Sequence, residues 1–160
     1  MGGVYRKGCE KAVITVVATE NEKSLVKWEG EIVVTGVGAI NVMETLKDVD
    51  KKKKIHNIGY AGSNSIQVGT TVKVGDVGLY HPTVDYKEKK YKLDGNVPCY
   101  TSTDFVTSTK ETTPCVFDME LAFILAMGFE NVTAEKVVSD NLSVRQYEKT
   151  ASEQAQNEER

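Results

Sequence analysis

The sequence predicts an α/β protein with a mixed, largely parallel central sheet that is flanked by helices. Short β-branched runs recur along the chain, and several are apolar at nearly every position, as expected of strands covered on both faces. Segments with apolar residues at helical spacing lie between these runs, and such an alternation favours parallel strands. The length of 160 residues fits one domain.

Six segments have the composition of strands. Each contains valine, isoleucine or threonine and is followed by a glycine or a polar residue. The predicted strands span residues 12–18, 31–35, 54–58, 70–74, 77–80 and 135–139. Residues 80–96 are rich in lysine, tyrosine and aspartate, and they could form either a hairpin or an excursion from the sheet.

Two helices are predicted between the strands, over residues 38–49 and 118–127. The second helix ends before Gly128, because glycine readily adopts the left-handed conformation that closes many helices. The first helix carries one apolar stripe at helical spacing, which consists of Ile40, Met43, Leu46 and Val49.

Composition and charge exclude several classes of protein. Twenty basic residues are outnumbered by 23 acidic ones, so the sequence gives no electrostatic case for a nucleic-acid partner. The cysteines, Cys9, Cys99 and Cys115, have no CxxC spacing. Reduced, partly buried thiols are therefore expected. The spacing predicts neither a disulfide framework nor a structural metal site.

The ends of the chain and its apolar stretches indicate where the protein acts. Residues 1–10 lack the apolar segment of a signal peptide, and the most apolar stretch, residues 119–127, is too short to span a membrane. A soluble, cytoplasmic protein is expected. Residues 1–150 are expected to form the single domain, and residues 151–160, nearly without apolar residues, a disordered tail.

Candidate functional residues lie where predicted strands end, because ligands of open α/β sheets bind at the carboxyl ends of the strands. These positions are residues 19–22, 35–38, 59–62 and 139–141. Taken singly, each has a structural alternative. The 35–38 turn could bind an anion or only link strand to helix, Asp140 could cap a helix, Glu120 could complement a helix dipole, and Glu22 could be an exposed loop carboxylate.

The order of these segments is more informative than any one of them. TENE, VVTGVGAINV, IHNIGYAGSNS, VKVGDVGLY, STDFVTS, FDMELAFI and KVVSDN follow one another between residues 13 and 141. This series resembles the nucleoside phosphorylase and nucleosidase superfamily, and most closely the 5′-methylthioadenosine/S-adenosylhomocysteine nucleosidases, of which the chain looks like a shortened member. The resemblance implies a phosphorylase/hydrolase-like fold.

The resemblance also implies a reaction, cleavage of the N-glycosidic bond between a purine and ribose. Asp140 matches the aspartate that protonates or hydrogen-bonds purine N7, and Ser139 would hold its carboxyl group. Glu22 matches the glutamate that activates the attacking water, a role suited to a carboxylate base. Glu120 matches the glutamate that binds the ribose hydroxyls and favours the developing sugar cation.

Further residues would bind the substrate. Phe105 matches the aromatic residue that stacks on the purine, and the backbone of Val106 would read the base edge. Lys136 falls where the family often keeps an arginine near the nucleophile, and Tyr60 replaces a small residue and could crowd the sugar. The implied substrate-binding residues are Glu120, Met119, Phe105, Val106, Ser139, Ala61, Gly62 and Lys136.

The choice of nucleophile depends on the phosphate pocket. Related phosphorylases carry a serine-containing turn and extra arginines, whereas residues 38–41 lack serine and the chain has three arginines, Arg6, Arg145 and Arg160. Hydrolysis is therefore expected, with phosphorolysis or non-catalytic nucleoside binding as alternatives. The resemblance implies no cofactor and no metal. It implies a homodimer whose partner closes the 5′ side of the pocket, with His81 and Tyr86 as candidate contacts.

Overall fold

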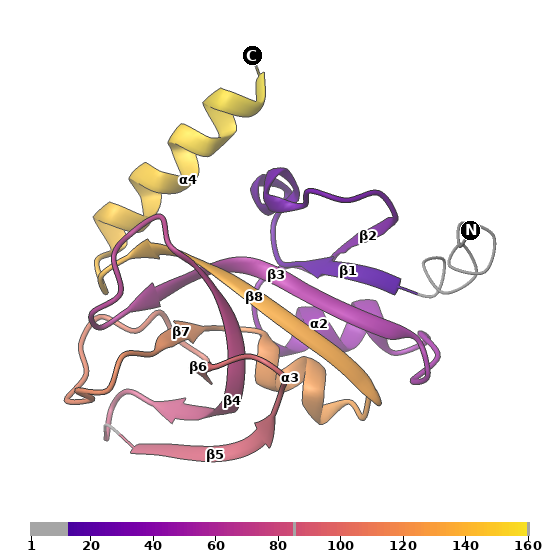
Figure 1. The fold of residues 1–160 in the computed structure, drawn as a ribbon, viewed down its shortest axis with the longest axis horizontal. Helices are drawn as coiled ribbons and strands as arrows, with labels where there is room; N and C mark the ends of the chain where they lie inside the picture. The colour runs from indigo at the N-terminus through magenta and orange to yellow at the C-terminus, as the bar shows by residue number, and fades with distance from the viewer. Residues whose placement is uncertain (1–12, 85, 160) are drawn as a thin grey trace.

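We describe a computed structural model of the chain over residues 13–84 and 86–159 (Figure 1). All eight strands of this part belong to one sheet. The strands are β1 (Val13–Val17), β2 (Glu31–Val34), β3 (Lys54–Ser63), β4 (Thr71–His81), β5 (Tyr86–Lys92), β6 (Val97–Thr101), β7 (Val116–Asp118) and β8 (Asn131–Asp140). The sequence prediction for residues 1–10 and the prediction for Cys9 lie outside the described residues.

Four strands, β1, β2, β3 and β8, form one parallel part of the sheet, and β6 also pairs in parallel with β4 and β7. Strand β1 pairs in parallel with β2 on one side and with β3 on the other, and β3 pairs in parallel with β8. Ile14 lies opposite Ile55, and Ile55 lies opposite Val132, so apolar side chains share one face across these strands. This shared face is buried, since all three side chains belong to the hydrophobic core.

The rest of the sheet corrects the expected architecture, because the strands close into a ring. Strand β3 pairs with β7, β7 with β6, β6 with β4, β4 with β8, and β8 with β3. The pairs of β3 with β7 and of β4 with β8 are antiparallel. The fold is therefore a mixed sheet with a closed ring and attached helices, and it is not a simple parallel sheet flanked by helices.

The ring also changes two of the expected strands. The segments predicted at residues 70–74 and 77–80 are one continuous strand, β4. Pairing with β5, β6 and β8 holds this strand together across the intervening Gly75 and Asp76. Of the two possibilities for residues 80–96, the hairpin is confirmed, because β4 and β5 form an antiparallel pair.

The helical elements are the 3₁₀ helix η1 (Glu20–Leu25) and the α-helices α2 (Ala39–Leu46), α3 (Leu121–Ala126) and α4 (Val144–Glu159). Helix α3 ends as predicted, with Gly128 in a left-handed conformation at φ 95°. Helix α4 is helical as far as Glu159, so it includes residues 151–159 of the segment that was expected to be a disordered tail. Figure 1 shows its last turns extending away from the sheet.

The apolar stripe of α2 differs from the predicted one. Val42 and Leu46 are fully buried, whereas Ile40 is 71% and Met43 48% exposed. Helix α2 packs against α3 and the sheet through the face that carries Val42 and Leu46. The predicted stripe mixed the two faces, so Ile40 and Met43 are left on the outer surface.

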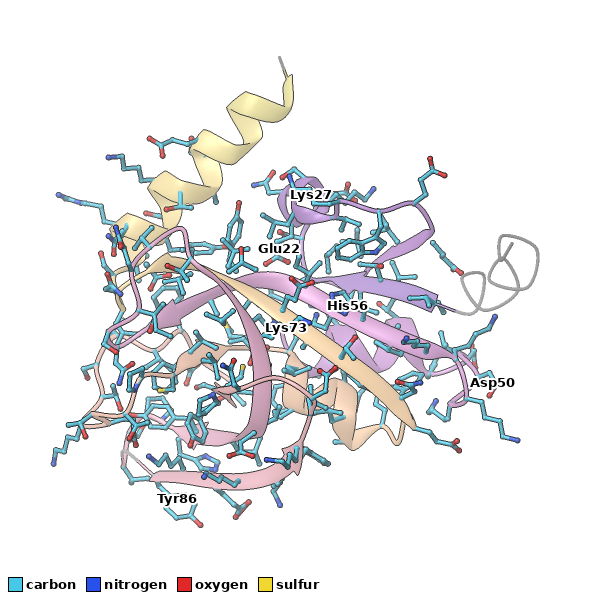
Figure 2. The ribbon with its side chains drawn as sticks, in the orientation of Figure 1. Glu22, Lys27, Asp50, His56, Lys73 and Tyr86 are labelled. Atoms are coloured by element: carbon cyan, nitrogen blue, oxygen red, sulfur yellow. The ribbon has the colours of Figure 1, made fainter. Side chains whose placement is uncertain are left out.

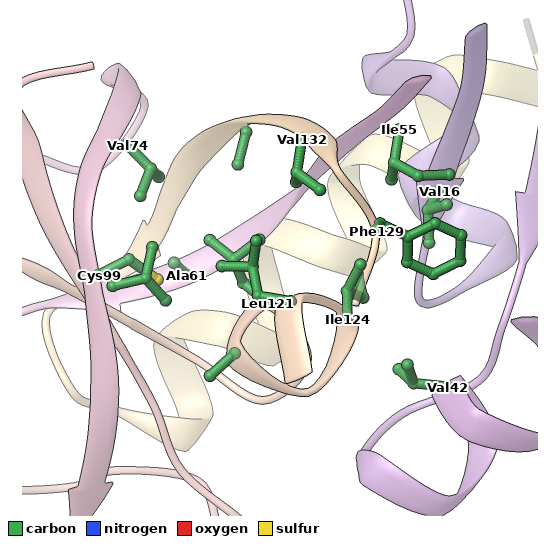
Figure 3. Packing of buried hydrophobic residues seen from close by; sticks show 14 of the residues in the cluster. Val16, Val42, Ile55, Ala61, Val74, Cys99, Leu121, Ile124, Phe129 and Val132 are labelled. Atoms are coloured by element: carbon green, nitrogen blue, oxygen red, sulfur yellow. The ribbon is translucent and has the colours of Figure 1, made fainter. Parts of the chain in front are cut away.

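The hydrophobic core lies between the sheet and the helices α2 and α3 (Figure 3). Leu121 and Ile124 of α3 are fully buried among side chains from the ring strands, including Val74 and Val138. Burial of one such side chain stabilises the folded chain by about 1.5–3 kcal/mol. Helix α3 thus holds the ring together from one side.

Cys99 and Cys115 are free and buried, as expected, and burial raises the pKa of Cys115 to about 11. Within residues 13–84 and 86–159, no helix has the length and apolar character needed to cross a lipid bilayer.

Candidate functional site

A cavity of about 230 Å³ opens where β1, β3 and β8 end. This position agrees with the rule that ligands bind at the carboxyl ends of the strands. The residues that line the cavity are Ala18, Thr19, Glu22, Val37, Tyr60, Ala61, Gly62, Phe105, Phe117, Asp118, Met119, Glu120, Ser139, Asp140 and Tyr147.

Glu22 enters the cavity from η1, which follows β1 (Figure 2). It is only 5% exposed, so the alternative of an exposed loop carboxylate is wrong. One oxygen, Oε1, accepts hydrogen bonds from the N–H groups of Ala18 at 2.8 Å and Thr19 at 3.2 Å. The other, Oε2, accepts one from the N–H of Tyr60 at 2.8 Å. Three backbone donors therefore fix this carboxylate between the ends of β1 and β3.

Asp140 is the last residue of β8 and is fully buried. Its Oδ1 accepts a hydrogen bond of 2.6 Å from the Ser139 hydroxyl, as the sequence predicts for Ser139. Its Oδ2 accepts hydrogen bonds from the N–H groups of Leu142 at 2.9 Å and Ser143 at 3.3 Å. Asp140 therefore accepts hydrogen bonds from the turn that leads into α4, in agreement with the structural alternative, and it also lines the cavity.

Two glycines let these carboxylates lie against β3. A side chain at Gly59 would place its Cβ 2.8 Å from Oε2 of Glu22, and a side chain at Gly62 would place its Cβ 2.8 Å from Oδ2 of Asp140. Both distances are shorter than a Cβ atom tolerates. Gly62, which was predicted to bind substrate, lines the cavity and also leaves space for the Asp140 carboxylate.

Glu120 reaches the cavity from the start of α3. Its Oε2 accepts a 3.0 Å hydrogen bond from the N–H of Gly38, in the turn that precedes α2. Burial, and then the neighbouring Asp118 carboxylate, raise the pKa of Glu120 to about 7. The backbone donor of the 35–38 turn, the N–H of Gly38, therefore binds the Glu120 carboxylate of the same chain.

Lys136 occupies a different place from the one predicted. Its ammonium lies 3.1 Å from Oδ2 of Asp118, both side chains are buried, and Lys136 does not line the cavity. Burial alone would lower the pKa of Lys136, but Asp118 raises it above its usual value. Burial alone would likewise raise the pKa of Asp118, but Lys136 and the Thr101 hydroxyl at 2.5 Å lower it. Lys136 therefore supports the cavity wall as the partner of Asp118.

The remaining predicted residues lie together around the cavity. Phe105, Met119 and Ala61 line it directly, and Val106 is buried beside a small adjoining cavity of about 30 Å³. Phe105 and Asp140 therefore both line the main cavity and the small adjoining one. Among the described residues, no group of three or more His, Cys, Asp or Glu side chains is placed to hold a metal ion.

Sequence reasoning missed the contribution of Tyr147. This residue lies on α4, shortly before the segment 151–160 that was expected to be a disordered tail, and its ring lines the cavity. A lone aromatic residue in a polar segment was the only signal available. Asp118 was also missed as a buried charge, because its partner Lys136 is distant in the sequence.

The comparisons with known proteins identify the fold. Neither the protein-family models nor the curated proteins give a match to the sequence. A variant of the nucleosidase MTAN from Chlamydia trachomatis, bound to MTA, has a TM-score of 0.72 and 15% identity over 90% of this chain and 91% of that one.

Two further structures extend the likeness. Futalosine hydrolase of Helicobacter pylori strain 26695 has a TM-score of 0.70 and 11% identity over 93% of this chain and 94% of that one. A 5′-methylthioadenosine/S-adenosylhomocysteine nucleosidase from Helicobacter pylori, with butyl-thio-DADMe-Immucillin-A, has a TM-score of 0.67 and 11% identity over 89% of this chain and 92% of that one. The chain therefore has the fold of these structures.

Proposed function

We propose that the chain is a purine nucleosidase that hydrolyses the N-glycosidic bond of methylthioadenosine- or adenosylhomocysteine-type nucleosides. One observation carries the proposal. Glu22, Glu120 and Asp140, which come from three distant segments, line a single cavity together with Phe105. Structures with the same fold are nucleosidases, one of them bound to MTA, and they support this choice of chemistry. A methylthioadenosine substrate would place the reaction in methionine salvage in the cytoplasm.

At the base, Asp140 acts as the acid. Cleavage moves negative charge into the purine, so a proton or hydrogen bond at N7 makes the base a better leaving group. The Ser139 hydroxyl and the N–H groups of the α4 turn hold the Asp140 carboxyl at a fixed orientation. Phe105 offers an aromatic face to the same base.

At the sugar, Glu120 binds the ribose hydroxyls. A carboxylate in this place stabilises the positive charge that develops on the ribose in the transition state. The Gly38 N–H fixes one of its oxygens at 3.0 Å. Because the pKa of Glu120 is about 7, its charged form is present from neutral pH upward.

Water is the proposed nucleophile, with Glu22 as its base. The backbone N–H groups that orient Glu22 leave its carboxylate in the cavity wall, where it can accept a proton from water. Phosphate fits less well, because the N–H of Gly38 already binds Glu120. Arg145, the arginine whose side chain lies in the described residues, is exposed on α4 and does not line the cavity.

We propose in addition that the chain forms a homodimer through the outer faces of α2 and α3. Met43, Phe123 and Met127 lie around a groove of about 400 Å³ between these helices, and Lys47 and Lys51 also line it. Ile40 is exposed on the same helix as Met43, and Val37, just before α2, is exposed and also lines the cavity. Because Val37 lies just before α2 and lines the cavity, a second copy that covered this face would also cover the cavity wall at Val37.

Release of free base tests the proposed reaction. Methylthioadenosine, adenosylhomocysteine, adenosine and inosine are incubated with the protein, with and without phosphate, and free purine is measured. We expect purine release that needs no phosphate and that falls by about 10²–10⁴-fold in Asp140→Asn and in Glu22→Gln. Both substitutions keep the size of the side chain, and thermal unfolding confirms that the variants fold.

Other outcomes identify the alternatives. Release that depends strictly on phosphate would assign a phosphorylase. Thermal stabilisation by a nucleoside without any release of base would assign a binding protein. Full activity in Glu22→Gln would remove this residue from the mechanism.

A further inference from the structure

The loop of residues 102–115 joins β6 to β7 and carries the two proposed base-binding residues, Phe105 and Val106. Phe105 lines the cavity, and Val106 is buried in a cluster of aromatic side chains. Residues 102–115 form neither helix nor strand. A segment without a backbone ladder of its own keeps a fixed conformation only through contacts with other elements. These contacts therefore decide where the base-binding surface lies.

Asn64 follows the last residue of β3, and its side-chain amide binds the second half of the loop. Its Nδ2 donates hydrogen bonds to the carbonyls of Glu111 at 2.9 Å and Thr113 at 3.0 Å. Its Oδ1 accepts a hydrogen bond from the N–H of Cys115 at 3.1 Å. These partners fix the orientation of the amide, because a flipped amide would face two carbonyls with its oxygen. We call the three hydrogen bonds the Asn64 clamp.

The Asn64 clamp extends a short pair of strands. Strands β3 and β7 pair at two positions, the last of which joins Ser63 to Val116. The Ser63 hydroxyl also donates a hydrogen bond to the carbonyl of Cys115 at 2.7 Å. Asn64 comes next along the chain, where its amide binds backbone groups that a longer ladder of peptide groups would otherwise bind. The clamp therefore carries the attachment to β3 beyond β7 and into the loop.

The Asn64 clamp lies beside the cavity. Asn64 does not line the cavity, whereas Gly62, two residues earlier on β3, lines it next to Asp140. The small adjoining cavity of about 30 Å³ is lined by Gly62 of β3 and by Phe105 and Val106 of the loop. A shift of the loop relative to the end of β3 would therefore change the space beside Asp140 where the base is proposed to bind.

The three carboxylates of the site are held by other parts of the chain. Their hydrogen-bond donors are the backbone N–H groups of residues 18, 19, 38, 60, 142 and 143 and the Ser139 hydroxyl. Loss of the Asn64 clamp would therefore displace the loop and leave the proposed acid and base in place. Such a change weakens substrate and transition state alike, so it raises KM and leaves kcat nearly constant.

We propose that Asn64 is a positioning residue of the purine site, whose clamp holds the 102–115 loop against the end of β3 so that Phe105 and Val106 offer a fixed surface to the base. This inference rests on the proposed nucleosidase function and adds to it a residue outside the cavity. Asn64 acts on base binding through the loop, and it takes no part in the cleavage step.

Kinetics and product binding of Asn64→Asp test the inference. The substitution keeps the shape of the side chain but turns an oxygen toward the two carbonyls that Nδ2 binds, so both donated hydrogen bonds are lost. We expect KM for methylthioadenosine and the calorimetric Kd for adenine to rise together by about tenfold. Over the same comparison, kcat should change by less than about twofold.

Trypsin cleavage after the exposed Lys110 measures the attachment of the loop without any need for catalysis. Cleavage there requires local opening of the segment that the clamp holds, so we expect it to be at least about tenfold faster in Asn64→Asp than in the wild type. Asn64→Ala removes all three hydrogen bonds without adding a charge. It should behave in the same way, and it replaces Asn64→Asp if thermal unfolding shows that this variant does not fold.

Asn131→Asp is the matched control. It makes the same chemical change at an exposed position at the start of β8, and it should match the wild type in KM, adenine Kd and cleavage rate.

Three results would overturn the inference. Unchanged cleavage after Lys110 in both Asn64 variants would show that the clamp does not hold the loop. Faster cleavage with unchanged KM and Kd would show that the held loop does not shape the base site. A fall in kcat at constant KM would assign Asn64 to the cleavage step.

Failure of the proposed function gives a different result. If the wild type hydrolyses no nucleoside, the nucleosidase function fails, and the adenine Kd and the cleavage rate decide the inference by themselves. A higher Kd and faster cleavage in the Asn64 variants would then support the positioning role in a purine-binding site. A wild type that does not bind adenine would overturn the positioning role as well.

Discussion

Three carboxylates meet in one cavity, and the fold holds each of them differently. The Glu22 carboxylate accepts hydrogen bonds from three backbone N–H groups. The Asp140 carboxylate accepts them from a serine hydroxyl and two backbone N–H groups, and the Glu120 carboxylate accepts one from a single backbone N–H group. Glu120 also lies close to the buried Asp118. It is therefore the carboxylate whose charge is least supported by donors, in agreement with its raised pKa.

This difference predicts a pH-dependent stability. The pKa of Glu120 is about 7 in the folded chain and 4.5 in its ordinary state, so the carboxylate has a higher proton affinity in the folded chain than in the unfolded chain. The resulting stabilisation is fully present below about pH 4.5 and is lost as the pH rises through about 7. Between pH 5 and pH 8 the wild type should lose about 2–3 kcal/mol more free energy of unfolding than Glu120→Gln.

Urea unfolding of both proteins across this pH range measures the effect. Glu44→Gln, at an exposed position on α2, is a matched control that should follow the wild type. Parallel stability profiles for the wild type and Glu120→Gln would show that Glu120 does not titrate near neutral pH.

At the scale of elements, the pair of Asp118 and Lys136 joins the end of β7 to the middle of β8. The Asp118 carboxylate also accepts hydrogen bonds from the Leu121 N–H at 2.8 Å and from the Thr101 hydroxyl of β6. One buried carboxylate therefore connects two ring strands to the helix that packs against them.

Removal of the lysine is expected to be costly. Lys136→Met leaves Asp118 buried without its cation, and we expect the free energy of unfolding to fall by about 3–5 kcal/mol. Lys47→Met removes the exposed pair of Lys47 with Glu44, which has the similar distance of 3.2 Å, and should cost less than about 1 kcal/mol. Denaturant unfolding of the two variants gives the comparison, and equal losses would contradict a structural role for the buried pair.

Local patterns predicted the elements that obey local rules. The end of α3 follows from Gly128, and the strands β1, β2 and β8 follow from β-branched composition. The stripe of α2 was wrong, because periodicity alone does not say which of two apolar faces meets the core. The ion pair of Asp118 and Lys136 could not be predicted for another reason, because the sequence does not show which distant charged residues are buried together.

At the scale of the whole molecule, the outer face of α2 and α3 predicts the oligomeric state. Analytical ultracentrifugation of the wild type should show a dimer, and Ile40→Glu with Met43→Glu should shift it to monomer, because exposed apolar side chains would otherwise be buried at the interface. Val84→Glu tests the rival contact at His81 and Tyr86. This exposed residue lies between the two, whose rings stack 5.8 Å apart.

The two sets of variants distinguish the surfaces. A dimer that persists in Val84→Glu and dissociates in the α2 variants supports the proposed interface. A dimer lost only in Val84→Glu would move the interface to the β4–β5 hairpin, and a monomeric wild type would contradict the homodimer.

The site residues were predictable to a greater extent than the architecture. The ordered series of motifs pointed to Glu22, Glu120 and Asp140, and all three line the cavity. The ring could not be predicted from the sequence, because it depends on which strands pair across long separations. Tyr147 was missed on the same account, since a polar helix acquires its aromatic contact only when the fold brings α4 beside β3 and η1.

The ring has a consequence for how the chain is made. Strand β8 lies between β3 and β4, yet it is the last strand of the sheet to leave the ribosome during synthesis. Until it arrives, β3 and β4 each expose an unpaired edge, which is the kind of edge that recruits strands from other chains. Asp140 is the final residue of that strand. A nascent chain therefore keeps these edges exposed until the strand that also carries its proposed acid has been made.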